Sequence, residues 1–274
     1  MEGLVQRSGA TGLWQRAWYR SDCQALVVML HGIQSHSGWY VGSASQLAEA
    51  GVSVVAPDRR GSGMNAAARG DTPNHRVLLE DLRRTVREVR TRFPGRPLHL
   101  IGISWGGKLA ATFALRYPQL LRTLILVAPG LASQRDLGIR QKCWVPFWRF
   151  WEPARPFPIP LSDPELFTAN AERRRYIAAD PLSLRQASAR FLLASRGLDV
   201  LLRHKACALR LPVLLFLAGR DRIVDNGVVR RFFAALPDEG KRLVYYPEAH
   251  HTLEFEPDPR PFFEELVRWV LPMR

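Results

Sequence analysis

The chain has few cysteines and no long apolar run, and each shortage excludes a class of protein. Its 274 residues hold three cysteines, Cys23, Cys143 and Cys207, which are widely separated and show no C-x-x-C spacing. That set excludes a disulfide framework and a zinc site, so we expect free thiols and no metal or other cofactor. No stretch approaches the roughly 18 apolar residues of a membrane-spanning helix, and the first residues lack the apolar core of a signal peptide. We therefore expect a soluble, cytoplasmic protein.

Acidic residues are the scarcer charge. The chain has 25 Asp and Glu against 39 Lys and Arg, which gives a formal net charge of +14 at pH 7. Such a basic surface raises nucleic acid as a partner. The arginines are nevertheless scattered in small groups, such as Arg59-Arg60 and Arg83-Arg84, and no nucleic-acid-binding motif accompanies them. We therefore expect a solvated basic surface and no nucleic-acid partner, while the oligomeric state stays open.

Short apolar runs alternate with amphipathic helical patterns over most of the chain. The expected strands are Ala25–Leu30, Val52–Ala56, Pro97–Ile103, Leu121–Ala128, Pro212–Ala218 and Lys241–Tyr246. The expected helices are Gly38–Ala50, Val77–Phe93, Lys108–Tyr117, Asn226–Ala235 and Pro261–Leu271. Nearly continuous hydrophobicity is typical of strands that are buried on both sides. The pattern therefore predicts an α/β fold, with a mostly parallel twisted sheet flanked by helices.

The alternation stops between Ser133 and Lys205. This segment holds an aromatic run, Trp144–Trp151, and then a proline-rich stretch, Pro153–Pro164. These prolines, together with Pro146, exclude a long helix there and favour extended or turn structure. A structureless loop of this length is improbable in a compact domain, so we expect a small helical cap. The predicted division is a core of residues 1–132 and 206–274 with a cap of residues 133–205.

A glycine-rich turn separates the strand Pro97–Ile103 from the helix that follows. It reads Gly102-Ile103-Ser104-Trp105-Gly106-Gly107. A strand that turns sharply into a helix strains the backbone at the corner and leaves room only for small neighbours, which these glycines supply. The turn exposes the serine hydroxyl at the carboxyl edge of the sheet, in front of a helix N-terminus. Ser104 is therefore the candidate nucleophile, and the alternative is an ordinary serine in a glycine-rich connection.

A serine nucleophile needs a histidine base that is oriented by a carboxylate. Asp221 follows the strand Pro212–Ala218, and His251 follows the strand Lys241–Tyr246. Each has a neighbouring rival: we favour Asp221 over Asp225, which suits the cap of the next helix, and His251 over His250. The resulting chain order is Ser, Asp, His, in which all three residues follow strand ends.

Acyl transfer also needs two backbone N–H groups for the oxyanion, one of them from the residue after the nucleophile. That residue is Trp105. The second donor should lie in the loop after the strand Ala25–Leu30, where we choose Ile33. His31 and His36 in the same loop have no Cys or acidic cluster to complete a metal site, so we expect structural roles for both.

Four segments together resemble the monoglyceride lipase and lysophospholipase branch of the α/β-hydrolase superfamily, which is also the serine aminopeptidase type. They are the loop His31–Tyr40, the turn Gly102–Gly107, and the segments that contain Asp221 and His251. The loop matches the branch pattern H-G-x-G-E-H-S-x-R-Y at His31, Gly32, His36, Ser37 and Tyr40, but Gln34, Ser35 and Trp39 depart from it. Ile103 and Trp105 depart from the usual G-H-S-M-G-G. The resemblance covers most of the chain and implies the α/β-hydrolase fold, a Ser104-Asp221-His251 triad and the donors Ile33 and Trp105.

The resemblance also gives a role to two other segments. Asp58-Arg59-Arg60-Gly61-Ser62-Gly63 matches a D-x-x-G-x-G loop that is mostly structural in this superfamily, and we expect both arginines to be exposed to solvent. The family inserts its cap after the sixth strand, where the cap selects the substrate. The aromatic run of the cap can line an acyl-chain channel, form the packing core of the cap, or contact a membrane interface. For the channel, the candidate substrate-binding residues are Trp144, Phe147, Trp148 and Trp151.

The leading functional hypothesis is a serine hydrolase that cleaves a lipid-like carboxylic ester, such as a monoacylglycerol or a lysophospholipid, through an acyl-enzyme. A thioesterase or an aminopeptidase uses the same triad, because fold and triad do not fix the leaving group. An acidic anchor for a substrate amine, for which Asp163, Glu165 and Glu172 are candidates, would favour the peptidase. A hypothesis of another class is a non-catalytic, hydrolase-like protein that binds a lipid or a partner.

Overall fold

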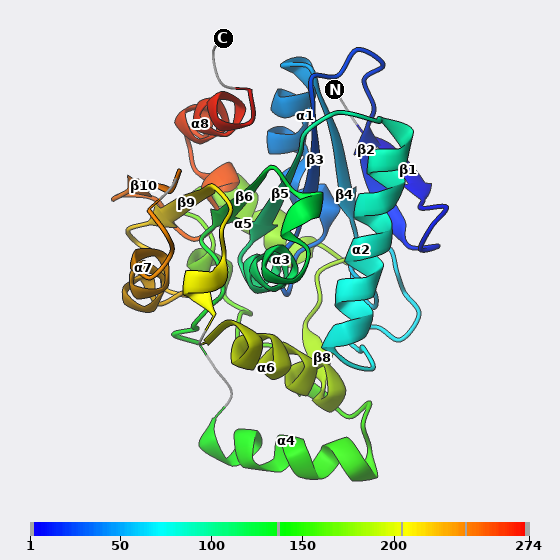
Figure 1. Ribbon diagram of the computed structural model, residues 1–274. Helices are drawn as coiled ribbons and strands as arrows, with labels where there is room; N and C mark the ends of the chain where they lie inside the picture. The colour runs from blue at the N-terminus through cyan, green and yellow to red at the C-terminus, as the bar shows by residue number, and fades with distance from the viewer. Residues whose placement is uncertain (1–2, 136–137, 204, 239, 272–274) are drawn as a thin grey trace.

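The computed structural model describes residues 3–135, 138–203, 205–238 and 240–271, and an eight-stranded sheet forms its centre (Figure 1). The strand order is β1-β2-β4-β3-β5-β6-β9-β10. The strands are β1 (Leu4–Arg7), β2 (Trp14–Trp18), β3 (Ala25–Leu30), β4 (Val52–Pro57), β5 (Leu98–Ile103), β6 (Thr123–Val127), β9 (Val213–Ala218) and β10 (Arg242–Tyr246). The six strands from β4 to β10 pair in parallel, as predicted, and β1 and β2 add an antiparallel edge that the sequence analysis missed.

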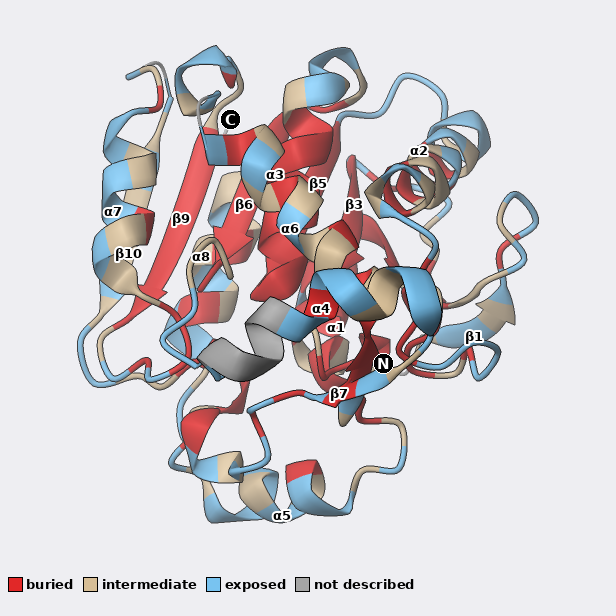
Figure 2. Ribbon diagram, turned by 90° about the horizontal axis from the view of Figure 1, so that it is seen from below, coloured by how far each residue is buried: buried red, intermediate tan, exposed pale blue. Residues whose placement is uncertain are grey.

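Helices cover both faces of this sheet. In the core of the molecule they are α1 (Val41–Glu49), α2 (His75–Arg92), α3 (Trp105–Arg116), α7 (Asn226–Ala234) and α8 (Arg260–Val270). Short 3-10 turns lie at Ser37–Tyr40, Pro118–Leu120, Pro164–Leu166, Ala206–Ala208 and Leu253–Phe255. Every residue of β3, β5, β6 and β9 is buried, as the red strands of Figure 2 show. This two-sided burial is the reason why their sequences are apolar almost throughout.

Residues 133–205, which we call the cap, lie in the chain between β6 and β9. They contain α4 (Ile139–Trp151), α5 (Ala171–Ala179), α6 (Ala189–Arg203) and a two-stranded antiparallel sheet of β7 (Pro156–Pro158) and β8 (Gln186–Ser188). α6 packs on α3 of the core, and α4 packs on the outer side of α6 (Figure 1). In the described part of the chain, no helix combines the length and the hydrophobicity that a membrane crossing requires.

Pro146 does not prevent a helix, which corrects the expectation from the sequence. α4 is 13 residues long and contains this proline. The ring of Pro146 is exposed, while the adjacent Val145 is buried against Phe157 and Ala189. The stability gained from this apolar contact offsets the loss of the backbone hydrogen bond that a proline removes from a helix. The rest of the proline-rich stretch is extended or turned, as predicted.

Candidate active site

Ser104 stands at the corner between β5 and α3 in a strained backbone conformation. Its φ is 51° and its ψ is −123°, a region that residues with a side chain rarely adopt. The flanking glycines are needed for space, because a Cβ at Gly106 would lie 2.6 Å from the carbonyl oxygens of Leu30 and His31. One at Gly102 would lie 2.6 Å from the Cβ of Ala110. The turn therefore has the strained, closely packed geometry that its sequence predicts, and 9% of Ser104 is exposed.

Asp221 and His251 form a buried hydrogen-bonded pair. The Nδ1 atom of His251 lies 2.8 Å from the Oδ2 atom of Asp221. The other carboxylate oxygen accepts the backbone N–H groups of Ile223 and Val224 at 2.8 and 2.9 Å. Three donors thus hold this carboxylate in one orientation. Because Nδ1 faces this carboxylate, Nε2 is the imidazole nitrogen that is left to accept a proton.

The two rivals from the sequence have other partners. Asp225 is the N-cap of α7, where its Oδ1 accepts the N–H groups of Gly227 and Val228 at 2.8 and 3.1 Å. His250 faces Glu256, with 3.4 Å between Nδ1 and Oε1. The structure therefore brings His251 and Asp221 together and gives Asp225 the capping role that we expected.

The loop after β3 packs directly against Ser104. A Cβ at Gly32 would lie 3.2 Å from the Cβ of Ser104 and 3.5 Å from its hydroxyl oxygen. Within the described residues, the backbone N–H groups of Ile33 and Trp105 donate to no loop, turn or side-chain acceptor. Trp105 is the first residue of α3, a position whose N–H has no partner inside the helix. Both N–H groups beside the serine are thus available to a ligand.

The histidines of this loop have structural contacts. The His31 Nε2 atom accepts the backbone N–H of Arg59 at 2.9 Å, so Nδ1 carries the proton and donates to the Gly32 carbonyl at 2.8 Å. Burial holds the pKa of His31 well below its usual range, which keeps the ring neutral. Among the described residues, no group of His, Cys, Asp and Glu side chains is arranged to hold a metal ion.

Asp180 of the cap fastens the same loop and was not identified from the sequence. Its Oδ2 atom lies 3.0 Å from Nε2 of His36 and accepts the Trp39 indole N–H at 2.7 Å. Although burial opposes ionisation, these bonds hold the pKa of Asp180 below its usual range. Trp39, which stands where the branch pattern has an arginine, thus binds the cap. No local motif marks Asp180, because its partners lie more than a hundred residues away in the sequence.

Arg59 is buried, which corrects the expectation that both arginines of its loop are exposed. Only 8% of Arg59 is accessible, and its guanidinium donates to the carbonyls of Gly32 and Ile33 at 3.1 and 3.0 Å. The loop turns this side chain inward over the ring of Trp105. Arg60 is partly exposed and pairs with Asp81 at 2.8 Å.

The aromatic residues of α4 lie mostly on the surface. The exposed fractions are 53% for Trp144, 42% for Phe147, 85% for Phe150 and 74% for Trp151. Trp148 is half-buried and packs against the cluster of Val145, Phe157 and Ala189. Figure 2 shows the described part of α4 as a largely exposed helix. α6 lies between α4 and α3, and in the described part of the chain the aromatic rings of α4 pack on one another around Phe147.

The three acidic residues of the cap that we considered as amine anchors are exposed. Asp163 caps a 3-10 turn and lies 3.8 Å from Arg222. Glu165 pairs with Arg174 at 3.0 Å. Glu172 is exposed in the first turn of α5. None of the three is aimed at a buried site in the described structure.

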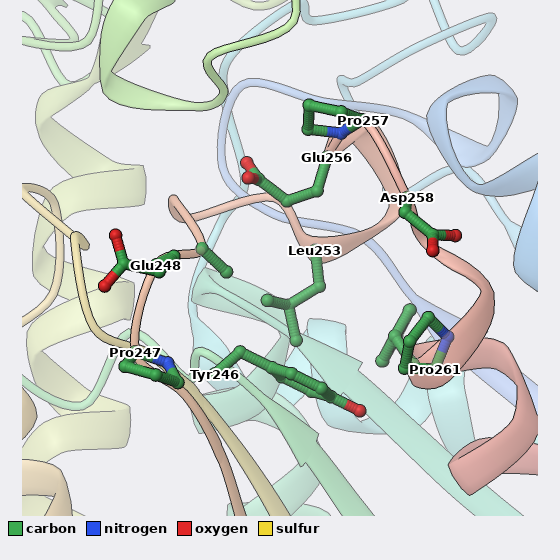
Figure 3. A pocket seen from close by; sticks show the side chains of 10 residues that line it. Tyr246, Pro247, Glu248, Leu253, Glu256, Pro257, Asp258 and Pro261 are labelled. Carbon is green, nitrogen blue, oxygen red and sulfur yellow. The ribbon is translucent and has the colours of Figure 1, made fainter.

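A cavity of about 260 Å³ lies beside the loop that carries His251 (Figure 3). Its lining comes entirely from residues 246–262, with Leu253 in the middle and Tyr246 along one side. Two of its carboxylates already have cationic partners, since Glu248 pairs with Arg220 and Asp258 with Arg260. Neither Ser104 nor His251 lines this cavity, so it is separate from the candidate site.

The chain is similar to several known proteins over most of its length. The family model for serine aminopeptidase, S33, matches residues 21–258. The monoacylglycerol lipase of Mycolicibacterium smegmatis is 25% identical over 255 residues, which cover 92% of this chain and 89% of that protein. The human monoglyceride lipase is 25% identical over 258 residues, which cover 90% of this chain and 82% of that protein.

Solved structures show the same fold. The monoacylglycerol lipase of Paleococcus ferrophilus superposes with a TM-score of 0.85 at 23% identity, over 94% of this chain and 98% of that one. A monoglyceride lipase of Saccharomyces cerevisiae gives a TM-score of 0.85 at 19% identity, over 98% of this chain and 95% of that one. The chain therefore has the α/β-hydrolase fold that the sequence predicted.

Proposed function

The chain belongs to the serine aminopeptidase S33 family, and on that premise we propose that it hydrolyses a lipid-like carboxylic ester, such as a monoacylglycerol or a lysophospholipid, through an acyl-enzyme. The buried pair of Asp221 and His251, together with the strained Ser104, is the observation that carries this proposal. The names of the relatives support the substrate class, since several are called monoacylglycerol or monoglyceride lipases.

In the proposed reaction, the Ser104 hydroxyl oxygen attacks the ester carbonyl while Nε2 of His251 takes the hydroxyl proton. Asp221 holds the imidazole by Nδ1 and stabilises the imidazolium that forms. The negative charge moves to the former carbonyl oxygen, where the N–H groups of Ile33 and Trp105 bind it. Collapse of this intermediate expels the alcohol, which receives the proton from His251. Water then attacks the acyl-enzyme by the same steps and releases the acid.

An ester fits the site better than a peptide. An aminopeptidase needs an anionic group near the serine to bind the substrate amine. Of the three candidates, Asp163 lies near Arg222, Glu165 pairs with Arg174, and Glu172 is exposed. A thioester would use the same attack and the same oxyanion site. We therefore place the ester first and keep the thioester as the second candidate reaction.

The cap supplies the proposed lid and the proposed membrane contact. We assign residues 1–132 and 206–274 to the hydrolase core and residues 133–205 to a lid over the site. The exposed face of α4, formed by Trp144, Phe147, Phe150 and Trp151, has the aromatic character of helices that lie in a lipid interface. A docked α4 would bring the lid to the membrane in which a monoacyl lipid resides. Trp148, which is half-buried, then belongs to the packing core of the lid.

Labelling by a fluorophosphonate tests the proposed site, because this probe reacts with activated serines. We expect labelling of the wild type and none of Ser104→Ala. The matched pair His251→Ala and His250→Ala should separate the base from its neighbour: the first abolishes labelling and the second leaves it. Labelling of Ser104→Ala, or a failure to label the wild type, would contradict the proposal and favour the non-catalytic alternative.

The substrate class needs a separate measurement. Pure enzyme is assayed against p-nitrophenyl esters of increasing chain length, monoacylglycerols, lysophospholipids, acyl thioesters and aminoacyl amides. We expect the highest kcat/KM among the monoacyl esters with long chains. A higher kcat/KM for thioesters or aminoacyl amides would keep the triad and overturn the ester assignment.

A further inference from the structure

Arg59 contacts three successive residues of the loop that lies against Ser104. Its backbone N–H donates to Nε2 of His31 at 2.9 Å. Its guanidinium donates to the carbonyl of Gly32 at 3.1 Å and to the carbonyl of Ile33 at 3.0 Å. One residue thus fixes both the course of the loop and the direction of its peptide groups.

The first of these carbonyls belongs to the same peptide unit as a proposed oxyanion donor. The Gly32 carbonyl and the Ile33 N–H are the two ends of one planar amide. This carbonyl accepts two hydrogen bonds, one from Nδ1 of His31 at 2.8 Å and one from the cationic Arg59. A hydrogen bond from a cation is stronger than a neutral one, and bonds at one end of an amide polarise the other end. Arg59 therefore makes the Ile33 N–H a stronger donor.

The same guanidinium also contacts the residue of the second donor. It lies over the Trp105 ring, 4.6 Å from the centroid, and over Phe191 of α6 at 5.0 Å. The Trp105 indole N–H donates to the hydroxyl of Ser195 at 2.9 Å. Trp105 is thereby held between Arg59 and the cap.

The charge of Arg59 has no direct ionic partner. Among the ion pairs of the described residues, none includes Arg59, and its Nε atom has no hydrogen-bond partner. The adjacent Asp58 is occupied with the backbone N–H groups of Ser37 and Met64, at 2.7 and 2.9 Å. A buried cation without a paired anion is unfavourable, and a negative charge that develops nearby relieves it. Burial lowers the pKa of Arg59 to about 9, although the charge of the nearby Asp58 opposes this shift.

We propose that Arg59 is a positioning residue of the oxyanion site. Its guanidinium polarises the Gly32–Ile33 peptide and holds Trp105 in place beside that peptide. Arg59 touches no substrate atom and acts through the two backbone donors. This inference rests on the proposed function. It gives a role to a buried arginine whose guanidinium donates to the carbonyls of Gly32 and Ile33.

The test compares Arg59→Met, Arg59→Lys and the control Arg60→Met, whose residue is partly exposed and pairs with Asp81. For each variant, kcat and KM are measured with a soluble p-nitrophenyl ester, together with the inhibition constant of an alkyl trifluoromethyl ketone. This ketone forms a tetrahedral oxyanion with an active serine. Thermal midpoints report folding. Loss of a full oxyanion donor costs about a hundredfold to a thousandfold in kcat, so loss of its polarisation should cost less.

For Arg59→Met we expect kcat to fall about tenfold to a hundredfold, with the ketone weakened by a similar factor and KM changed by about twofold at most. Arg59→Lys keeps the charge without the two-pronged geometry and should recover part of kcat. Arg60→Met should retain wild-type kcat. Millimolar guanidinium should raise kcat of Arg59→Ala by filling the vacated site.

Two results would overturn the proposal. The first is a folded Arg59→Met with wild-type kcat and ketone affinity. The second, which decides the matter if Arg59→Met fails to fold, is a folded Arg59→Lys that equals the wild type in both. Failure of the proposed function is distinguishable, because it would leave the wild type itself unlabelled by the fluorophosphonate, or Ser104→Ala labelled.

Discussion

The imidazole of His251 is held 2.8 Å from the carboxylate of Asp221, and both side chains are buried. The carboxylate is held in turn by the backbone N–H groups of Ile223 and Val224. The groups that orient the Asp221 side chain are thus main-chain N–H groups of its own loop, at the end of β9. The cap also contacts this region, because Gln134 donates to the carbonyls of Asp221 and Val224 and the ring of Phe167 lies 6.1 Å from that of His251.

The pair of aspartates at the end of β9 gives the first prediction. Asp221→Asn should lower kcat about a thousandfold to ten-thousandfold, because it removes the charge that orients and stabilises the imidazolium. Asp225→Asn should leave kcat close to the wild-type value and cost well under the ~1 kcal/mol of a lost N-cap, since asparagine also caps helices. Steady-state kinetics and urea unfolding of both variants make the check. Equal losses of kcat would contradict the assignment.

Gly106 gives a prediction about stability. A Cβ at this position would meet backbone oxygens at 2.6 Å, and backbone cannot move aside easily. Gly106→Ala should therefore lower the free energy of unfolding by about 2 kcal/mol or more, as overpacking does. In the control Gly9→Ala, the nearest atom is the end of the flexible Glu88 side chain at 3.3 Å. Its change should stay within about 0.5 kcal/mol, the usual range for surface positions. Similar losses in the two variants would refute the steric argument.

Glu254 predicts a pH dependence of stability. Burial raises its pKa from 4.5 to about 7 in the folded protein, in spite of hydrogen bonds from Ser43. A carboxyl with a raised pKa favours the folded state fully below pH 4.5, and this contribution is lost as the pH rises toward 7. Between these values, the free energy of unfolding should fall by about 3 kcal/mol in the wild type relative to Glu254→Gln.

The measurement is urea unfolding of wild type and Glu254→Gln from pH 4.5 to 8. Glutamine resembles the protonated carboxyl, so other titrating groups cancel in the difference between the two proteins. A difference that does not change with pH would show that Glu254 ionises normally in the folded state.

The exposed face of α4 predicts binding to lipid. The double variant Phe150→Ser and Trp151→Ser should reduce sedimentation with phosphatidylcholine and phosphatidylglycerol vesicles at least tenfold, because both side chains are largely exposed and contribute little to the fold. Its activity on a water-soluble short-chain ester should stay near the wild-type value. Unchanged vesicle binding would remove α4 as the contact surface.

The sequence predicted the parts of the fold that have a local cause. The strands β3, β5, β6 and β9 are apolar because both their faces are buried, and the strain at Ser104 follows from its glycines. β1 and β2 were missed because they are short strands with polar positions, and β1, at the edge of the sheet, is mostly exposed. The pairing of β2 with β4 depends on contacts that no local pattern records.

The same distinction applies to the candidate site. Ser104, Asp221 and His251 each follow a predicted strand, so their common position at one sheet edge could be inferred. Arg59 could not be placed, because only the tertiary approach of Gly32 and Trp105 determines that its side chain is buried. Long-range contacts between loop and cap, such as Asp180 with His36, have no sequence signal at all.

The central claim is that Ser104 carries the acyl group during hydrolysis, and its most direct test is mass spectrometry of the trapped intermediate. The wild type is mixed with a p-nitrophenyl ester, quenched in acid within the first turnover, and digested. We predict that the acyl mass is found on the peptide that contains Ser104, and that it is absent from Ser104→Ala. An acyl group on another residue, or hydrolysis by Ser104→Ala at the wild-type rate, would contradict the account.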